Sequence, residues 1–437
     1  MDTAQSADLE DLRNFLTIPS VSADPTKRSD MLAASEWVAE YLRNACGGTA
    51  DVHCDRPQPL VTGHVAASSS TDVNVLIYGH YDVQPPGDLS LWHTAPFAPV
   101  VRDGYIYARG ASDDKGNFFI LLRAVAALVK ADKLPVNVYV LCDGEEEIGG
   151  DSATSWLASC ETSLDACVIF DGLRIESDTP VLCTGTRGLL YLRIEVVTAT
   201  QEVHSGTFGG IALNAAHVLI QMLARVIDTG DGLPPELLFG AATNDVDDAW
   251  LGLKPSLLSE LKLLRRASEE EFAHRTWMAP SLDVHGLQCG DPGVVKTSIP
   301  ASASATVSMR VAPGQSNEIC ERNLSELLVA AAPQGAQVEL ATLSDVRPSA
   351  IGGTSSAIGA ACAAFEGVLG VTPMLVREGG TLPLMAELAD RGIPVVMTTF
   401  SEPDDNVHAP NERFRIGHIH QGAEVATELL QRLGATS

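Results

Sequence analysis

The residue types best suited to chemistry in this sequence stand at the ends of predicted strands and helices. His80 and Asp82 directly follow the apolar, β-branched run Val73–Tyr78, which predicts a buried strand. Residues i and i+2 of an extended chain point to the same side, so the imidazole and the carboxylate leave the strand together. The carboxyl end of a strand is where open α/β sheets bind ligands. A loop histidine beside a turn-forming aspartate explains this pair equally well.

Four further positions repeat this placement of an acid or a histidine at an element end. They are Asp113-Asp114 before the apolar helix predicted over Gly116–Val129, Glu145-Glu146-Glu147 after the strand Val136–Cys142, Asp171 after the strand Ala166–Phe170, and His408 after the strand Val395–Thr399. Each has an ordinary explanation, because acids stabilise helix N-termini and a short acidic run is commonly a solvated surface. Taken together, the five positions predict a cluster at one edge of a sheet.

A cluster of this composition needs positive charge, and Lys115 is the only lysine among these groups. Two histidines with several carboxylates and no cysteine suit Zn²⁺ first, with Mn²⁺ or Co²⁺ as alternatives. The cluster offers more ligands than one tetrahedral ion needs. It therefore predicts two ions that share a bridging carboxylate, at a separation of roughly 3.5–4 Å.

The elements that must position these residues alternate between strands and helices. Helical periodicity over Asp8–Leu16 and Asp30–Arg43 precedes the strands and the helix named above. The same pattern returns towards the C-terminus, with helices expected at Ser355–Phe365, Leu382–Arg391 and Ile419–Leu433. This β-α-β order predicts an α/β fold with a mostly parallel sheet and helices on its faces.

The pattern changes near Thr186 to that of a smaller α+β domain. Strands with one covered and one open face are predicted by strict alternation of apolar and polar residues. The elements expected there are the strands Leu190–Val196, Ala305–Val311 and Gln337–Leu343, the helices Asn214–Ile227 and Ser316–Ala332, and an insertion at Asp228–Pro280 that is helical around Leu257–Arg266. We therefore predict an α/β domain over residues 1–185 and 346–437, interrupted by an α+β domain over residues 186–345.

Composition narrows the possible partners. The chain has 437 residues, and 29 Lys and Arg against 56 Asp and Glu give a formal net charge of −27. Phosphate backbones and anionic lipid repel such a chain, so neither nucleic acid nor a membrane is an expected partner. The polar, acidic N-terminal segment is not expected to act as a signal peptide, and no apolar run reaches the roughly 18 residues that span a membrane. Nine scattered cysteines without a CxxC pair indicate a reduced protein, and we expect a cytoplasmic location.

Four segments resemble the signature segments of the M20 di-zinc metallopeptidases. They are Tyr78–Pro85 (YGHYDVQP), Gly110–Gly116 (GASDDKG), Glu145–Gly149 (EEEIG) and His408–Glu412 (HAPNE). This family includes carnosinase-type dipeptidases, glutamate carboxypeptidase, aminoacylase and the deacylases of amino-acid synthesis. The resemblance runs in order from roughly residue 8 to the C-terminus. It implies a catalytic domain of the di-zinc exopeptidase type and a smaller lid and dimerisation domain.

The resemblance also implies five metal ligands. His80 and Asp171 are expected to hold one ion, Glu147 and His408 the other, and Asp113 to bridge the two.

Two catalytic roles follow from the same resemblance. Asp82 is expected to orient the imidazole of His80, and Glu146 to act as the general base towards a metal-activated water. In the family the peptide bond after the bridging aspartate is cis, which here is Asp113–Asp114.

In the smaller domain the resemblance implies substrate contacts. His204 is expected to reach the active site of the other subunit of a homodimer and to polarise the scissile carbonyl there. Arg310 is expected to bind a substrate carboxylate, although the residues alone favour a surface salt bridge. The segment Glu378–Thr381 resembles the substrate loop of the family, with Gly379, Gly380 and Thr381 as contacts. Ser205 is not a predicted nucleophile, because nothing near it in the sequence supplies a base.

Three functions are compatible with these residues. The first is a di-metal hydrolase that cleaves the amide bond of dipeptides or short peptides, for which the dipeptidases are the nearest subgroup. The second is an amidohydrolase or deacylase that acts on N-acyl or N-carbamoyl amino acids with the same machinery. The third is a non-catalytic binding protein, which is disfavoured because such a protein usually lacks the base or a ligand.

Overall fold

The computed structural model describes residues 3–172, 174–177, 179–241, 262–264, 268, 271–350 and 355–435. The chain forms two compact units. The larger unit consists of Met1–Thr184, Ile351–Val376 and Pro383–Ser437, and the smaller unit of Gly185–Ala350 and Arg377–Leu382. It stays a prediction that the larger unit is catalytic. It also stays a prediction that the smaller unit serves as a lid and in dimerisation.

The larger unit is built on a twisted sheet whose central strands are parallel. In order across the sheet, its strands are β1 (Thr49–His53), β2 (Leu60–Val65), β6 (Asn137–Asp143), β3 (Asn74–His80), β7 (Ala166–Ile169), β17 (Val395–Met397) and β8 (Val181–Thr186), with β16 (Met374–Glu378) also paired to β8. Strands β6, β3, β7 and β17 run parallel to one another, and β1, β2 and β8 pair antiparallel. The predicted α/β class with a parallel sheet is confirmed.

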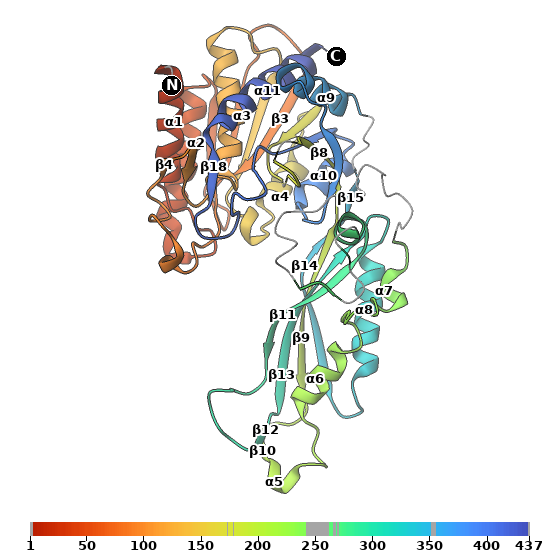
Figure 1. Cartoon of the computed structure of the whole chain (residues 1–437). Coiled ribbons are helices and arrows are strands. Elements are labelled where there is room, and N and C mark those ends of the chain that lie inside the picture. The colour runs from red at the N-terminus through yellow and green to blue at the C-terminus, as the bar shows by residue number, and fades with distance from the viewer. Residues whose placement is uncertain are drawn as a thin grey trace. The chain divides into compact units, whose positions relative to one another are not determined.

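Helices cover both faces of this sheet, which explains why its central strands read as continuous apolar runs. Leu76, Ile77 and Tyr78 of β3 are successive residues, and all are buried. The helices that share the main apolar core are α1 (Thr3–Leu16), α2 (Arg28–Asn44), α3 (Lys115–Lys130), α9 (Ser356–Leu369) and α11 (Ile416–Ala435). Helices α4 (Ser152–Ser159) and α10 (Pro383–Asp390) pack against each other and against β6 and β17 (Figure 1).

The strand register places the candidate residues at one edge of the sheet. His80 is the last residue of β3 and lies opposite Asp143, the last residue of β6. Tyr78 lies opposite Ile169, which ends β7, and Ile169 in turn lies opposite Met397, which ends β17. Because these strands are parallel, the segments that follow them all begin at the same edge.

A small three-stranded sheet adds a feature that the sequence pattern did not predict. It pairs β18 (Arg413–Arg415) with β5 (Tyr105–Tyr107), and β5 with β4 (Val100–Arg102). It joins the segment after His408 to the segment before Asp113, although about 300 residues of chain separate them.

The smaller unit contains a four-stranded antiparallel sheet in the order β11 (Ser281–Gln288), β13 (Ser302–Val311), β9 (Gly188–Val197) and β14 (Gln337–Val346). Alternate residues of β9 are buried, as the sequence pattern predicts for a sheet with one covered face. Residues of α6 (Ala215–Leu223) and α8 (Asn317–Ala331) form the core with the buried face of the sheet (Figure 1). A separate pair joins β10 (Val203–His204) to β12 (Ser298–Ile299).

Most element bounds agree with the predictions, but α1 begins at Thr3 where the prediction begins at Asp8, and α6 is shorter than predicted. This helix begins after Asn214, whose side chain accepts hydrogen bonds from two N–H groups of the first turn, and ends at Leu223. Helical periodicity predicted four more residues because Val226 still packs in the core, but Val226 belongs to a turn that bonds back to Leu223. Most of the helix expected around Leu257–Arg266 lies outside the described residues, apart from Lys262–Leu264.

All nine cysteines are free, as the sequence predicts, and Cys46, Cys142, Cys167, Cys183 and Cys320 are buried. No helix in the described part of the chain combines the length and the apolar character that crossing a membrane requires.

Candidate metal centre

Side chains from five separate segments meet at the carboxyl edge of the parallel strands. His80 ends β3, and Asp113 lies two residues before α3. Glu147 belongs to a single 3-10 turn, Glu146–Ile148, after β6. Asp171 lies two residues beyond β7, and His408 occupies the turn that follows β17. The structure thus brings together all five residues that the family resemblance implies as ligands.

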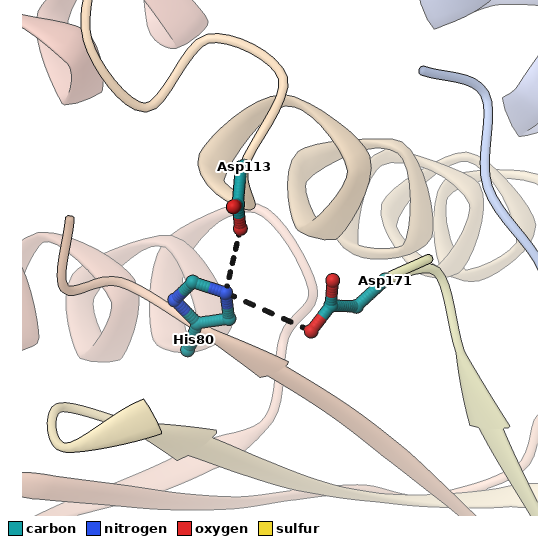
Figure 2. Close-up of side chains that lie close together, drawn as sticks. All are labelled: His80, Asp113 and Asp171. Carbon is teal, nitrogen blue, oxygen red and sulfur yellow. Dashed lines mark hydrogen bonds and ion pairs between the residues drawn. The ribbon is translucent and has the colours of Figure 1, made fainter. Parts of the chain in front are cut away.

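These residues form two groups that share one carboxylate. In the first group, His80 Nε2 lies 3.0 Å from Asp113 Oδ1 and 3.7 Å from Asp171 Oδ2 (Figure 2). In the second group, His408 Nε2 lies 2.8 Å from Asp113 Oδ2 and 3.2 Å from Glu147 Oε2. The potential ligand atoms within each group all lie within 4.8 Å of one another. Asp113 therefore presents one oxygen to each group, which is the arrangement that a bridging carboxylate requires.

The imidazole of His80 is oriented by its neighbours. Its Nδ1 lies 3.0 Å from the backbone oxygen of Asp82 and 3.4 Å from Asp82 Oδ1. A carbonyl oxygen can only accept, so Nδ1 donates to it, and Nε2 is the ring nitrogen that faces the carboxylates of Asp113 and Asp171. Asp82 Oδ2 also accepts the backbone N–H of Glu147 at 3.1 Å. Asp82 thus contacts one candidate ligand of each group.

Glu146 and Glu147 are adjacent, yet their carboxylates have different surroundings. The side chain of Glu147 is 4% exposed, and its carboxylate accepts hydrogen bonds from the backbone N–H and the side-chain amide of Gln84. The side chain of Glu146 is 21% exposed and lies 4.0 Å from His80 Nε2, outside both ligand groups. Hydrogen bonds therefore hold the carboxylate of Glu147 in place, as expected for a metal ligand. The carboxylate of Glu146 lies at the edge of the site.

The electrostatics of the site reflect the crowding of acids. Burial raises the pKa of Asp171 to about 7, and it raises the pKa of Glu146 well above its usual value, with Asp171 and Glu147 adding to the effect. Burial also acts to raise the pKa of Asp113, but hydrogen bonds with His408 and His80 hold it below its ordinary value. Hydrogen bonds to Asp113 and Glu147 raise the pKa of His408 to about 10. Each shift is the response expected where carboxylates outnumber positive groups.

Several residues at the site were not identified from the sequence. Gln84 holds Glu147 as described, and Asp114 Oδ2 accepts the backbone N–H of His80 at 3.3 Å. The peptide bond Asp113–Asp114 is cis, as the family resemblance implies. Lys115, fully buried, donates from Nζ to the backbone oxygens of Phe15 and Ile18 and so ties the end of α1 to this loop. Gln84 and Lys115 stand inside the quoted motifs without an assigned role, and the sequence suggests for Asp114 only the role of a helix-terminus acid.

A third acidic group consists of Glu402, Asp404 and Asp405. It differs from the first two groups because arginine side chains form ion pairs with its carboxylates. Arg413 lies 2.6 Å from Asp404, and Arg415 lies 3.0 Å from Glu402. These ion pairs account for the group without a metal ion.

The smaller unit holds the predicted substrate residues. Arg310 Nη1 donates to the hydroxyl of Thr381 at 2.8 Å, and that hydroxyl donates to the backbone oxygen of Arg187 at 2.7 Å. Arg187 also donates from Nε to the backbone oxygen of Gly379 at 3.3 Å. A Cβ at Gly379 would lie 2.5 Å from the backbone oxygen of Thr276, so only glycine fits there.

The structure thus brings Arg310, Gly379 and Thr381 together through Arg187, which the sequence analysis missed. Gly380 is the residue between the last two and has open space around its Cα. His204 ends β10, is exposed, and accepts the backbone N–H of Gly206 at its Nδ1.

The donor set of the two groups fits divalent metal ions. Imidazole nitrogens and carboxylate oxygens are ligands for Zn²⁺, Mn²⁺ and Co²⁺, and no thiol is among them. Beside the two groups, Asp114 Oδ1 and Asp82 Oδ1 are buried and have no hydrogen-bond partner among the described residues. The residues present therefore match two ions that share Asp113.

Comparison with known proteins agrees with this geometry. A family model described as Peptidase family M20/M25/M40 matches residues 76–432. The chain belongs to this family. The membership of the M20 family inferred from the four signature segments is confirmed, and the chain is an enzyme of the metallopeptidase class.

Among curated relatives, Beta-Ala-His dipeptidase of Mus musculus is 28% identical over 97% of this chain and 92% of its own. Cys-Gly metallodipeptidase DUG1 of Candida albicans is 26% identical over 98% of this chain and 94% of its own.

Solved M20 structures share the fold. The metallo-carboxypeptidase Sso-CP2 from Sulfolobus solfataricus superimposes with a TM-score of 0.86 at 25% identity, over 100% of both chains. The di-peptidase Dug1p from Saccharomyces cerevisiae gives a TM-score of 0.81 at 25% identity, over 99% of this chain and 97% of that one.

Replacing Asp113 with asparagine tests the shared carboxylate. We expect the dialysed and Zn²⁺-reconstituted wild-type protein to contain two ions per chain, and Asp113→Asn to lose both, because one oxygen serves each group. Elemental analysis after gel filtration measures the content. Asp404→Asn, from the acidic group that arginines satisfy, is the matched control and should retain two ions. Equal metal content in Asp113→Asn and the control would contradict a bridging role.

Proposed function

We propose that this chain is a dipeptidase that hydrolyses the amide bond of dipeptides or short peptides with two divalent metal ions, Zn²⁺ in the first instance. The observation that carries the proposal is the division of Asp113 between His80 and His408. Relatives named as Beta-Ala-His and Cys-Gly dipeptidases support the substrate class, since they match nearly the whole chain.

The proposed ligands are His80 and Asp171 for one ion and Glu147 and His408 for the other, with Asp113 between them. When bound, the ions supply Lewis acidity and a water of lowered pKa as the nucleophile. Asp82 keeps the Nε2 atom of His80 directed at its ion by accepting on the Nδ1 side, which preserves the geometry of the site.

Glu146 is proposed as the general base. It is the carboxylate at the rim of both ligand groups, 4.0 Å from His80 Nε2, and neither group includes it. From this position its carboxylate can take a proton from the attacking water and deliver that proton to the nitrogen of the leaving amine.

The smaller unit is proposed to hold the carboxyl end of the substrate. Arg310 donates to Thr381, and the carboxylate of Asp283 acts on its guanidinium. Burial lowers the pKa of Arg310, although the group stays charged at neutral pH. A partly buried guanidinium with a hydroxyl beside it suits the carboxylate of a dipeptide. Gly380, which has open space around its Cα, would allow close approach of the substrate to the backbone, and Gly379 would let this loop pack against Thr276.

We further propose a homodimer in which His204 of each subunit polarises the scissile carbonyl at the site of the other. The support is the family resemblance of its segment and its exposed position on β10. A C₂ arrangement would give two equivalent sites with exchanged histidines. The cytoplasmic location expected from the sequence also stays a prediction.

A substrate panel tests the proposed function. We expect Zn²⁺- or Mn²⁺-loaded protein to release free amino acids from dipeptides and to act far more slowly on N-acetyl and N-carbamoyl amino acids. Glu146→Gln protein, purified in the same way, controls for contaminating peptidases. A preference for the N-acyl compounds would establish the amidohydrolase alternative, and no activity on either class would contradict a hydrolase.

The neighbouring glutamates should separate chemistry from metal binding. Glu146→Gln should retain two ions and lose roughly 10²–10⁴-fold in kcat, because an amide cannot accept the proton. Glu147→Gln should instead lose metal content, since it removes a charged ligand. Turnover and metal analysis on both variants provide the measurement. The reverse pattern would show that base and ligand are exchanged.

Complementation tests the exchanged histidine. His204→Ala and Glu146→Gln proteins should each be nearly inactive, whereas mixed dimers should regain activity at the one site that combines an intact Glu146 with an intact partner histidine. Differently tagged subunits allow the mixed dimer to be isolated and assayed. If the mixed dimer forms and stays inactive, His204 does not act across subunits.

A further inference from the structure

Glu412 is the most completely bonded carboxylate near the candidate metal centre, and it is not one of the ligands. Its side chain is 0% exposed. Its Oε2 accepts from Arg109 Nη1 at 2.6 Å and from the backbone N–H of Gly110 at 2.9 Å. Its Oε1 accepts the backbone N–H groups of Ser112 at 2.8 Å and Asp113 at 3.1 Å. A single carboxylate therefore holds the loop that ends in the shared aspartate.

This bonding pattern requires an ionised carboxylate. All four partners of Glu412 are donors, and a carboxylate accepts at about four lone-pair sites without offering a hydrogen. A glutamine in the same place would direct an NH₂ group at one pair of donors. The charge is compensated by Arg109, which is 1% exposed and also donates to the backbone oxygen of Pro85. Burial raises the pKa of Glu412, whereas Arg109 and the backbone N–H groups of Ser112 and Gly110 act to lower it and favour the charged form.

The same residue joins the Asp113 loop to the segment that carries His408. The backbone oxygen of Glu412 accepts the N–H of Ala108 at 3.1 Å, where β18 begins to pair with β5. A second connection runs from the Ser112 hydroxyl to Asp405 Oδ2 at 3.1 Å. His408 lies between Asp405 and Glu412 in the sequence. Both ends of the turn that presents His408 are therefore bonded to the loop that presents Asp113.

We propose that Glu412 is a positioning residue for the metal centre: it fixes Asp113 against His408 before any ion binds, so that the shared carboxylate is preset to receive both ions. This inference rests on the two-metal function proposed above. In this proposal Glu412 contacts neither the substrate nor a metal ion. The loop that ends in Asp113 should therefore be ordered with or without metal.

The first test measures the affinity for Zn²⁺ by competition with a chromophoric chelator, on metal-free full-length protein. Glu412→Gln should bind Zn²⁺ about 10–100-fold more weakly than wild type, as is typical when a group that orients a ligand is removed. Asp8→Asn is the matched control, because it breaks an ion pair of equal length, 2.6 Å to Arg123, elsewhere in the larger unit. The control should lose thermal stability without losing affinity. Wild-type affinity in folded Glu412→Gln would overturn the proposal.

A second variant covers the case in which Glu412→Gln does not fold, since it leaves the buried Arg109 without a partner. The double variant Arg109→Met/Glu412→Gln removes both charges together. It should fold and show the same loss of Zn²⁺ affinity. Two ions bound at wild-type affinity by this variant would also overturn the proposal.

The wild-type protein supplies a test that needs no variant. In metal-free protein, hydrogen exchange of the peptide 109–114 should be slow, because Glu412 already accepts the N–H groups of Gly110, Ser112 and Asp113. Exchange that is fast without metal and slows only on adding Zn²⁺ would show that the ion, not Glu412, orders the loop. If the wild-type protein bound no Zn²⁺ at all, the proposed two-metal function would be wrong. Slow exchange of peptide 109–114 in that case would show that Glu412 still orders the loop, so the two failures can be distinguished.

Discussion

The constraint on which this structure depends is the burial of many carboxylates around one imidazole. Asp82, Asp113, Glu146 and Asp171 all approach the imidazole of His80, which is itself fully buried. Like charges in a medium of low dielectric repel strongly unless cations or protons join them. Lys115 and Arg109 offer these acids little positive charge, because Lys115 donates to the backbone oxygens of Phe15 and Ile18, and Arg109 pairs with Glu412. Two divalent ions would resolve this imbalance, and the site is organised as though to receive them.

The fold delivers these acids by a simple means. Parallel strands end at a common edge, and the chain places one acid or histidine in each of the segments that follow β3, β6, β7 and β17. The contribution from Asp113 is different, since it precedes a helix and has to be brought to that edge. Glu412 provides this by holding the Asp113 loop from a segment 299 residues further along the chain. The ends of the parallel strands determine at which edge of the sheet the site lies. Buried polar contacts between distant segments determine how its side chains are placed relative to one another.

Local patterns predicted the elements and the positions of the acids, because burial and periodicity act over a few residues. They did not reveal that Asp113 is divided between two histidines, which came from the family resemblance. Gln84 and Glu412 stand inside the quoted motifs and Arg187 stands in none, but no local pattern gives the role of any of them, since their partners are far away in sequence. The acidic segment around Asp404 shows the opposite case. Its sequence suits a metal ion as well as the segments that form the two proposed ligand groups do, but in the structure Arg413 and Arg415 form ion pairs with its carboxylates.

Anomalous scattering at the zinc edge from crystals grown with Zn²⁺ tests the central claim most directly. The account predicts two peaks per chain, roughly 3.5–4 Å apart, one beside His80 and Asp171 and the other beside Glu147 and His408, with Asp113 between them. A single peak, or a pair that Asp113 does not bridge, would contradict it.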